Sequence, residues 1–228
     1  MDAEFWHRRW QNNEIAFHEG KANGLLVNYF EELFGQRGSR VFLPLCGKTR
    51  DIGWLMSKGY RVAGAELSET AIEQLFKDLG IEPDRSEVGD LMLHSAEGID
   101  IFVGDIFQLS ASTLGAIDVV YDRAALVALP EEMRRHYAAH LAEITKLAPQ
   151  FLITFEYDQS EMDGPPFSVI GEEIYRCYGD RYDLRRRASV DVAGGLKGKC
   201  AATEHLWLLR TELAEAIASS AAKPRADS

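Results

Sequence analysis

The sequence predicts an α/β fold in which helices cover both faces of a doubly wound, mostly parallel sheet. First, short apolar strands alternate with amphipathic helices over residues 25–157, the order that produces parallel sheets. Second, the unit at 40–66 reads as strand, turn, helix and strand, and it ends on an acid. Third, the last two predicted strands, 182–192 and 203–210, have no helix between them, so one of them should be antiparallel.

The unit at 40–66 is the stretch around which the other elements are organised. Its first strand ends at Pro44, which cannot donate to a sheet, and Gly47 permits a sharp turn into the helix. Its second strand ends at Glu66, 19 residues after Gly47. An acid at this place in a nucleotide-binding βαβ unit accepts hydrogen bonds from ribose hydroxyls. The unit therefore predicts a nucleoside site.

Apolar periodicity places the remaining elements. Helices show apolar residues at helical spacing, and strands show β-branched or aromatic runs bounded by glycine. The other predicted elements are, in chain order, an aromatic helix within 5–18, helices at 25–34 and 69–79, a short hairpin near 91–94, strands at 99–103 and 117–121, a helix from 130 to about 146, a strand at 151–157 and a helix at 171–178.

Length and composition are those of one globular domain. Hydrophobic residues make up 46%, charged residues 27%, and the net charge is -11. This acidic balance argues against nucleic-acid or membrane partners, and we interpret three arginines at 185–187 as a solvated strand edge. We expect one domain at 1–210 with an N-terminal helical cover over about 1–35, followed by a flexible tail at 211–228.

The cysteines and the N-terminus indicate the compartment. Cys46, Cys177 and Cys200 are far apart in the sequence, which favours reduced thiols in a cytoplasmic protein over a disulfide scaffold or a zinc site. The N-terminus is charged throughout and no apolar run reaches membrane-spanning length. Cys46 lies near a helix N-terminus, which can lower a thiol pKa, but we interpret it as a packing residue.

The turn after the first strand indicates which nucleoside is bound. A dinucleotide needs the spacing G-x-G-x-x-G around its pyrophosphate, and L-P-L-C-G-K-T-R-D-I-G lacks it. The P-loop pattern is absent too, and no tyrosine has a lysine four residues on, as in short-chain dehydrogenases. S-adenosylmethionine has no phosphate. It needs a backbone turn, an acid and apolar contacts, and this turn suits it better.

Four motifs resemble the thiopurine S-methyltransferase family. They are W-x-x-x-W-x-x-x-x-x-x-F-H near the N-terminus, F-L-P-L-C-G-K before the acid, V-Y-D-R-A-A-L-V-A-L-P after the fourth strand and G-P-P-F in a late loop. The resemblance extends from about residue 5 to 210. It implies a Rossmann-like, seven-stranded sheet with an antiparallel last strand, a monomer, a small-molecule acceptor and S-adenosyl-L-methionine as cofactor.

The resemblance also implies the residues that bind the cofactor. Trp10, which from position alone reads as a core aromatic, becomes part of a cover over the cofactor, while Trp6 stays open between the two roles. Arg123 pairs with the cofactor carboxylate or orients the acceptor, with a salt bridge to Asp122 or Glu156 as the structural alternative. The implied cofactor-binding residues are Trp10, Phe17, Leu45, Glu66, Asp105, Ile106 and Arg123.

The implied acceptor site comprises Arg123, Pro166 and Phe167. This chain departs from the family in one respect: some members carry basic residues near the last hairpin that help to seat the substrate, whereas this hairpin has Lys197 and Lys199 but no arginine. The implied reaction transfers methyl to the sulfur of thiopurines or other aromatic thiols, or to selenium or tellurium species, in detoxification. Such nucleophiles ionise readily, so we expect catalysis by proximity without an acid–base residue.

Three alternatives accompany this interpretation. His136 and His140 have a spacing that can bind metal on a helix, but no third ligand is near in the sequence, and we interpret them as a solvated face. A non-catalytic module that binds S-adenosylmethionine would share the cofactor motifs. A nicotinamide-dependent oxidoreductase would share the βαβ unit.

Overall fold

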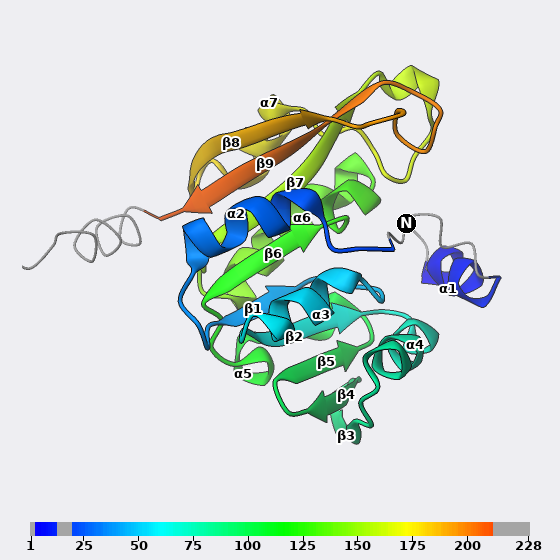
Figure 1. Cartoon of the computed structure of the whole chain (residues 1–228), viewed down its shortest axis with the longest axis vertical. Coiled ribbons are helices and arrows are strands. Elements are labelled where there is room, and N and C mark those ends of the chain that lie inside the picture. Colours follow the sequence, from blue (N-terminus) through cyan, green and yellow to red (C-terminus); the bar gives the residue numbers. More distant parts are fainter. Residues whose placement is uncertain (1–2, 13–19, 212–228) are drawn as a thin grey trace, which may run out of the picture.

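Nine strands form one sheet in the described residues, 3–12 and 20–211, of this computed structural model (Figure 1). The strand order is β3-β4-β5-β2-β1-β6-β7-β9-β8. The central strands from β5 to β7 are parallel, and β9 runs antiparallel between β7 and β8. The strands are β1 (Arg40–Leu43), β2 (Arg61–Glu66), β3 (Asp84–Val88), β4 (Leu91–Ala96), β5 (Ile99–Val103), β6 (Val119–Arg123), β7 (Gln150–Tyr157), β8 (Asp183–Asp191) and β9 (Ala202–Arg210).

The predicted fold class is confirmed, although the described sheet has nine strands where seven were predicted. The two additional strands, β3 and β4, form an antiparallel hairpin that extends the sheet beyond β5. Sequence reasoning expected only a short hairpin near 91–94. It missed β3 because four of its five residues are exposed, so the strand lacks the alternation that identifies a half-buried one.

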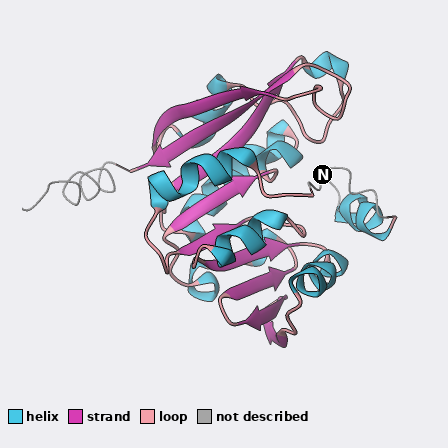
Figure 2. Ribbon diagram, in the orientation of Figure 1, coloured by secondary structure: helices cyan, strands magenta, loops and turns pink. Residues whose placement is uncertain are grey.

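Helices cover both faces of the sheet, as predicted (Figure 2). Alternate residues of β1 show the division: Val41 and Leu43 belong to a buried cluster with α2, α3 and α4, and Phe42 belongs to another with α5, α6 and α7. Thr49 and Ser68 accept backbone N–H groups as N-caps at the starts of α3 and α4. The helices are α1 (Ala3–Gln11), α2 (Gly24–Phe34), α3 (Arg50–Ser57), α4 (Glu69–Leu79), α5 (Ala111–Leu114), α6 (Glu131–Ile144) and α7 (Gly171–Tyr178), with 3-10 turns η1 (Ile106–Gln108), η2 (Leu126–Ala128) and η3 (Gln159–Glu161).

The two N-terminal helices have different surroundings. α2 belongs to the core, because Leu25, Leu26 and Phe30 are buried and the Phe30 ring packs against Phe151. α1 contacts α4 and lies at the side of the molecule toward which the arrowheads of β1, β2 and β6 point (Figure 1). The N-terminal segment thus approaches the carboxyl ends of the central strands.

The domain boundaries at 210 and at about 35 stay a prediction. Phe17 and residues 212–228 lie outside the described residues. Among the helices of the described ranges, none has the length and apolar character needed to cross a bilayer.

The three arginines at 185–187 lie on β8, at the outer edge of the sheet, and all three are exposed. Arg187 donates to Glu32 (Nη2 to Oε1, 3.0 Å) and Arg185 to Asp183 (Nε to Oδ2, 2.8 Å). The interpretation as a solvated strand edge is confirmed. Charged side chains on an edge strand also oppose pairing with a second chain.

Candidate cofactor and acceptor site

A cavity of about 730 Å³ lies at the carboxyl ends of the central strands. Parallel strands bring their carboxyl ends to one edge of a sheet, so residues that are distant in sequence meet there. The predicted site residues that line this cavity are Trp10, Leu45, Glu66, Asp105, Ile106, Arg123 and Pro166. Their roles in binding stay predictions.

The turn after β1 is the floor of the cavity. Leu45 and Gly47 both adopt positive φ, at 46° and 52°, and the Cys46 amide donates to the Ala65 carbonyl (2.9 Å). A Cβ atom on Gly47 would lie 3.1 Å from Cζ2 of Trp10. Glycine is therefore needed here both for the backbone conformation and for the close approach of Trp10. Trp10 is 4% exposed and lines the cavity. It is therefore buried, as expected of a core aromatic residue, and it also lies where a cover over the cofactor would have to lie.

Glu66 is held rigidly in the cavity wall. Its Oε2 accepts from the Gly47 amide (2.8 Å) and its Oε1 from the Ser68 amide (2.9 Å). The side chain is buried, and burial raises the pKa of this carboxyl, while the amides of Ser68, Gly47 and Leu67 act in the opposite direction. Each carboxylate oxygen has a second lone pair, so both can still accept from ligand hydroxyls.

Cys46 belongs to the same turn and also lines the cavity. Its Sγ would be 3.0 Å from a Cβ atom on Gly64. Burial, and then the charge of Glu66, raise the pKa of this thiol well above its ordinary value. The helix N-terminus does not dominate here, and the interpretation of Cys46 as a packing residue is confirmed.

The η1 turn forms a second wall. Asp105 caps it by accepting from the Phe107 amide (3.0 Å), and Ile106 is buried. The Ile106 carbonyl oxygen lies 2.8 Å from Nε2 of His140, and the ring of His136 stacks on Phe107 at 4.5 Å between centroids. His136 is exposed, as expected for a solvated face, but both histidines also contact η1, which their spacing did not predict. Within the described ranges, no group of metal-ligating side chains is present.

Arg123 lines the cavity at the end of β6, and the two acids suggested as its partners make other contacts. Asp122 accepts from the Tyr137 hydroxyl (2.8 Å) and from the Leu126 amide (3.2 Å). Glu156 lies 3.2 Å from Nε2 of His205. Arg123 thus stands where the sequence placed it, among the strand ends that surround the cavity.

The opposite wall is mostly apolar and includes the proline-rich loop. Pro165 and Pro166 line the cavity, and Lys197 donates to the Pro165 carbonyl (2.7 Å) from the β8–β9 connection. Phe167 lies behind this loop instead: its ring packs on Gly164 and lies 5.4 Å from the Arg134 guanidinium carbon. The structure therefore gives Phe167 a supporting position, whereas Pro166 faces the cavity.

A family model described as thiopurine S-methyltransferase matches residues 1–212. The chain belongs to the thiopurine S-methyltransferase family. A protein of that name from Xanthobacter autotrophicus is 55% identical over 210 residues, covering 92% of this chain and 99% of its own. Another from Teredinibacter turnerae is 53% identical, covering 92% and 97%.

Solved structures agree on the fold. Magnesium protoporphyrin IX methyltransferase from Synechocystis with bound SAM has a TM-score of 0.61 at 15% identity, covering 92% of this chain and 98% of its own. A TehB-like SAM-dependent methyltransferase from Corynebacterium glutamicum has a TM-score of 0.56 at 15% identity, covering 92% and 98%. With family membership, the predicted enzyme class and the predicted cofactor, S-adenosylmethionine, are confirmed.

Sequence reasoning missed part of this family member's cavity. Met133 and Tyr137 line it from α6, which is a helix and not a strand end. Val127 and Leu129 belong to the V-Y-D-R-A-A-L-V-A-L-P motif, so the motif itself was a signal that more than Arg123 is involved. The cavity wall also includes the cations Arg9, Lys21, Lys48 and Lys197.

Proposed function

We propose that this chain transfers a methyl group from S-adenosylmethionine to the sulfur of a thiopurine or another aromatic thiol. The observation that carries the proposal is one cavity with two kinds of wall. One wall combines the turn at 45–47 with the buried acid Glu66, and the other is an apolar surface from η2, α6 and the loop at 165–166. A volume of about 730 Å³ lies within the usual range for ligand pockets, roughly 300–1,000 Å³.

The polar wall fits the cofactor. Glu66 would accept from the ribose hydroxyls, the turn at 45–47 would hold the amino-acid end, and Arg123 would pair with its carboxylate. Asp105 and Ile106 would flank the adenine. When bound, S-adenosylmethionine supplies an electrophilic methyl group on a sulfonium.

The chain's own contribution is to bind, orient and exclude water. Orienting two reactants can supply about 7 kcal/mol or more of a barrier. Trp10 closes the cavity from the side of α1, and an aromatic face also attracts a cation. An aromatic thiol ionises readily, so no residue is assigned as a general acid or base.

The apolar wall supports an aromatic acceptor. Val127, Leu129, Met133 and Phe155 present side chains that suit a flat ring, and Pro166 borders the same space. Reduced selenium and tellurium species share the high nucleophilicity of a thiolate and are included as candidate acceptors, with detoxification as the role.

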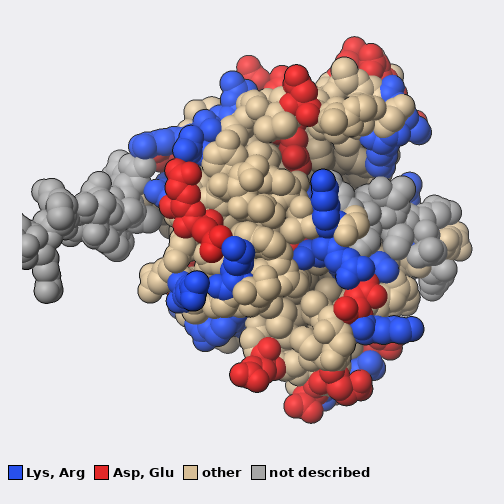
Figure 3. All heavy atoms as spheres, in the orientation of Figure 1, with Lys and Arg blue, Asp and Glu red and all other residues tan. Residues whose placement is uncertain are grey.

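We further propose a cytoplasmic monomer with one domain at 1–210 and no nucleic-acid partner. The net charge of -11 supports the last point. On the face shown in Figure 3, basic and acidic side chains are interspersed and do not form a single cationic surface. A nucleic-acid surface needs basic side chains gathered on one side.

Calorimetry with S-adenosylmethionine followed by transfer of a tritiated methyl group tests the proposal. We expect saturable binding and methylation of at least one acceptor in a screen of thiopurines, aromatic thiols, selenite and tellurite. Binding without transfer to any acceptor would support a non-catalytic binding module. Binding of NAD in place of S-adenosylmethionine would support an oxidoreductase.

A further inference from the structure

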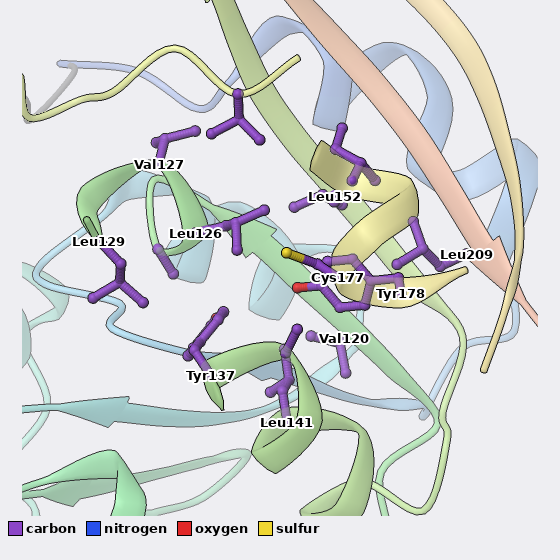
Figure 4. Close-up of a cluster of buried hydrophobic side chains, with 14 of the residues drawn as sticks. Val120, Leu126, Val127, Leu129, Tyr137, Leu141, Leu152, Cys177, Tyr178 and Leu209 are labelled. Carbon is purple, nitrogen blue, oxygen red and sulfur yellow. The ribbon is translucent and has the colours of Figure 1, made fainter. Parts of the chain in front are cut away.

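Asp122 precedes Arg123 at the end of β6, but its side chain enters the core. It is 0% exposed, whereas Arg123 lines the cavity. Leu126 of η2, Tyr137 of α6 and Tyr178 of α7 belong to one cluster of buried side chains (Figure 4). Asp122 therefore places a carboxylate where α6, α7 and η2 meet.

The Asp122 carboxylate bridges a bend in the chain. Oδ1 accepts from the Leu126 amide (3.2 Å), and Oδ2 accepts from the Tyr137 hydroxyl (2.8 Å). Between Asp122 and Leu126 in the chain, Ala124 adopts a φ of 68°. This left-handed conformation is unfavourable for any residue with a Cβ atom and persists only where the surroundings enforce it. The hydrogen bonds that Asp122 accepts supply such enforcement.

The bend shapes the cavity, although Asp122 itself does not face it. Arg123 and Ala124 line the cavity directly before the bend closes, and Val127 and Leu129 line it directly after. Tyr137, the side chain that donates to Asp122, lines it as well. A change in the hydrogen bonds of Asp122 would therefore move both the Arg123 side chain and the apolar wall formed by Val127 and Leu129.

We propose that Asp122 is a positioning residue: its ionised carboxylate, held by Tyr137, fixes the bend at 123–125 and with it the cavity wall formed by Arg123 and η2. The effect on ligand binding follows from the geometry alone. The effect on methyl transfer rests on the proposed function.

Because Asp122 can be protonated, the pH dependence of ligand binding tests this proposal. Burial raises the pKa of Asp122 from its ordinary value of 3.8 to about 6, while the hydrogen bonds from Tyr137, Leu126 and Ala125 act in the opposite direction. The titratable groups that face it are Tyr137 from α6 and Tyr178 from α7, with Cys177 beside the latter. Protonation below about pH 6 would replace an acceptor by an O–H group and weaken its hold on the bend.

The experiment measures the Kd of S-adenosylhomocysteine by calorimetry between pH 5 and 8. For the wild-type chain we expect weaker binding below about pH 6. For Asp122→Asn we expect affinity lower by about fivefold at pH 7.5, the equivalent of one good hydrogen bond. Because an amide does not titrate, the decrease in affinity below about pH 6 should be absent from this variant. Glu66 is present in every variant, so the comparison between variants isolates the contribution of Asp122.

Tyr137→Phe gives the sharper readout. It removes a donor that stabilises ionised Asp122, so the midpoint of the pH dependence should move to higher pH. A purely structural role for Tyr137 would lower stability and leave the midpoint in place. Asp118→Asn, an exposed acid at the other end of the same segment, is the matched control and should keep the wild-type profile.

Two outcomes would overturn the proposal: a Tyr137→Phe midpoint equal to that of the wild-type chain, or an Asp122→Asn variant with wild-type affinity and pH dependence. Circular dichroism establishes that each variant is folded, and Tyr137→Phe decides alone if Asp122→Asn does not fold. Failure of every acceptor in the methyl-transfer screen would refute the proposed function, yet the binding profiles would still decide the role of Asp122.

Discussion

Glu66 and Asp122 are two buried carboxylates in matching places with different surroundings. Their strands, β2 and β6, are the two neighbours of β1. Each carboxylate accepts from backbone amides of the chain that follows its strand, and burial raises the pKa of each. Glu66, however, lines the cavity, whereas Asp122 is enclosed by the core.

The difference shows that the same local chemistry serves two purposes. A buried acid that borders a cavity can recover its lost hydration from a ligand, so burial prepares it for binding. A buried acid that borders the core recovers hydration only from the chain, and it holds a shape at a cost in stability. A pKa raised from 3.8 to about 6 corresponds to about 3 kcal/mol.

The largest expected effect is on the stability of the Asp122 region as a function of pH. Because the pKa of Asp122 is higher in the folded state, folding takes up a proton between pH 3.8 and about 6. The stabilisation is present below this window and lost above it, about 3 kcal/mol in all, of which about 1 kcal/mol is lost between pH 5 and 7.5. Urea unfolding at several pH values should show that the free energy of unfolding falls more steeply with pH in the wild-type chain than in Asp122→Asn. Equal slopes would contradict it.

The substitution Gly64→Ala, two residues before Glu66 on β2, should have the next largest effect. A Cβ atom on Gly64 would lie 2.6 Å from Cδ1 of Ile101, which is 0% exposed, and 3.0 Å from Sγ of Cys46. Overpacking of this kind costs about 1–3 kcal/mol, so Gly64→Ala should lower the melting temperature. The matched control is Gly53→Ala on α3, where Cδ2 of Leu79 is at an ordinary 3.4 Å. Equal melting temperatures for the two variants would mean that the packing under Glu66 is loose.

Removing the carboxylate of Glu66 tests its side of the comparison directly. We expect Glu66→Ala to weaken S-adenosylmethionine binding by about tenfold, or about 1.4 kcal/mol, through loss of charge-assisted hydrogen bonds. Calorimetry at pH 7.5 measures it. Glu69→Ala, an acid on α4 whose side chain is 51% exposed, should bind as the wild-type chain does. Unchanged affinity in Glu66→Ala would place the ribose elsewhere.

The smallest expected effect concerns the cavity wall formed by the proline-rich loop. Lys197→Met loses the hydrogen bond to the Pro165 carbonyl. Because the bond lies near solvent, we expect about a threefold rise in the KM of the acceptor, near the low end for a hydrogen bond. The Kd of S-adenosylmethionine should not change, and Lys199→Met is the control. An equal loss in Lys199→Met would mean that general charge, not the bond to Pro165, matters.

The comparison also shows what the sequence could reveal. Glu66 was found because it ends the second strand of the βαβ unit, and Arg123 because it follows the fourth predicted strand within a family motif; the carboxyl ends of parallel strands meet at one edge of the sheet. Tyr137 and Met133 were missed because a helix brings them to the cavity, and which face of α6 meets it depends on packing. Asp122 was considered only as a partner for Arg123, since alternate residues of a strand point to opposite faces and the sequence does not show what lies on each.

Two further differences between the sequence-based predictions and the structure have local causes. The hairpin partner β3 escaped notice because a solvated edge strand has no buried side and hence no periodic signal. The spacing of His136 and His140 correctly placed both on one helix face, but spacing says nothing about Phe107, which comes from another element and stacks on one of them.

The thiol of Cys46 has a consequence for an enzyme that carries a reactive methyl donor. A thiolate beside such a donor would itself be methylated and would compete with the acceptor. Burial and the neighbouring charge of Glu66 raise the pKa of Cys46, so its sulfur stays protonated and a poor nucleophile. Burial, together with the acid that is predicted to hold the cofactor, thus protects the chain from alkylating itself.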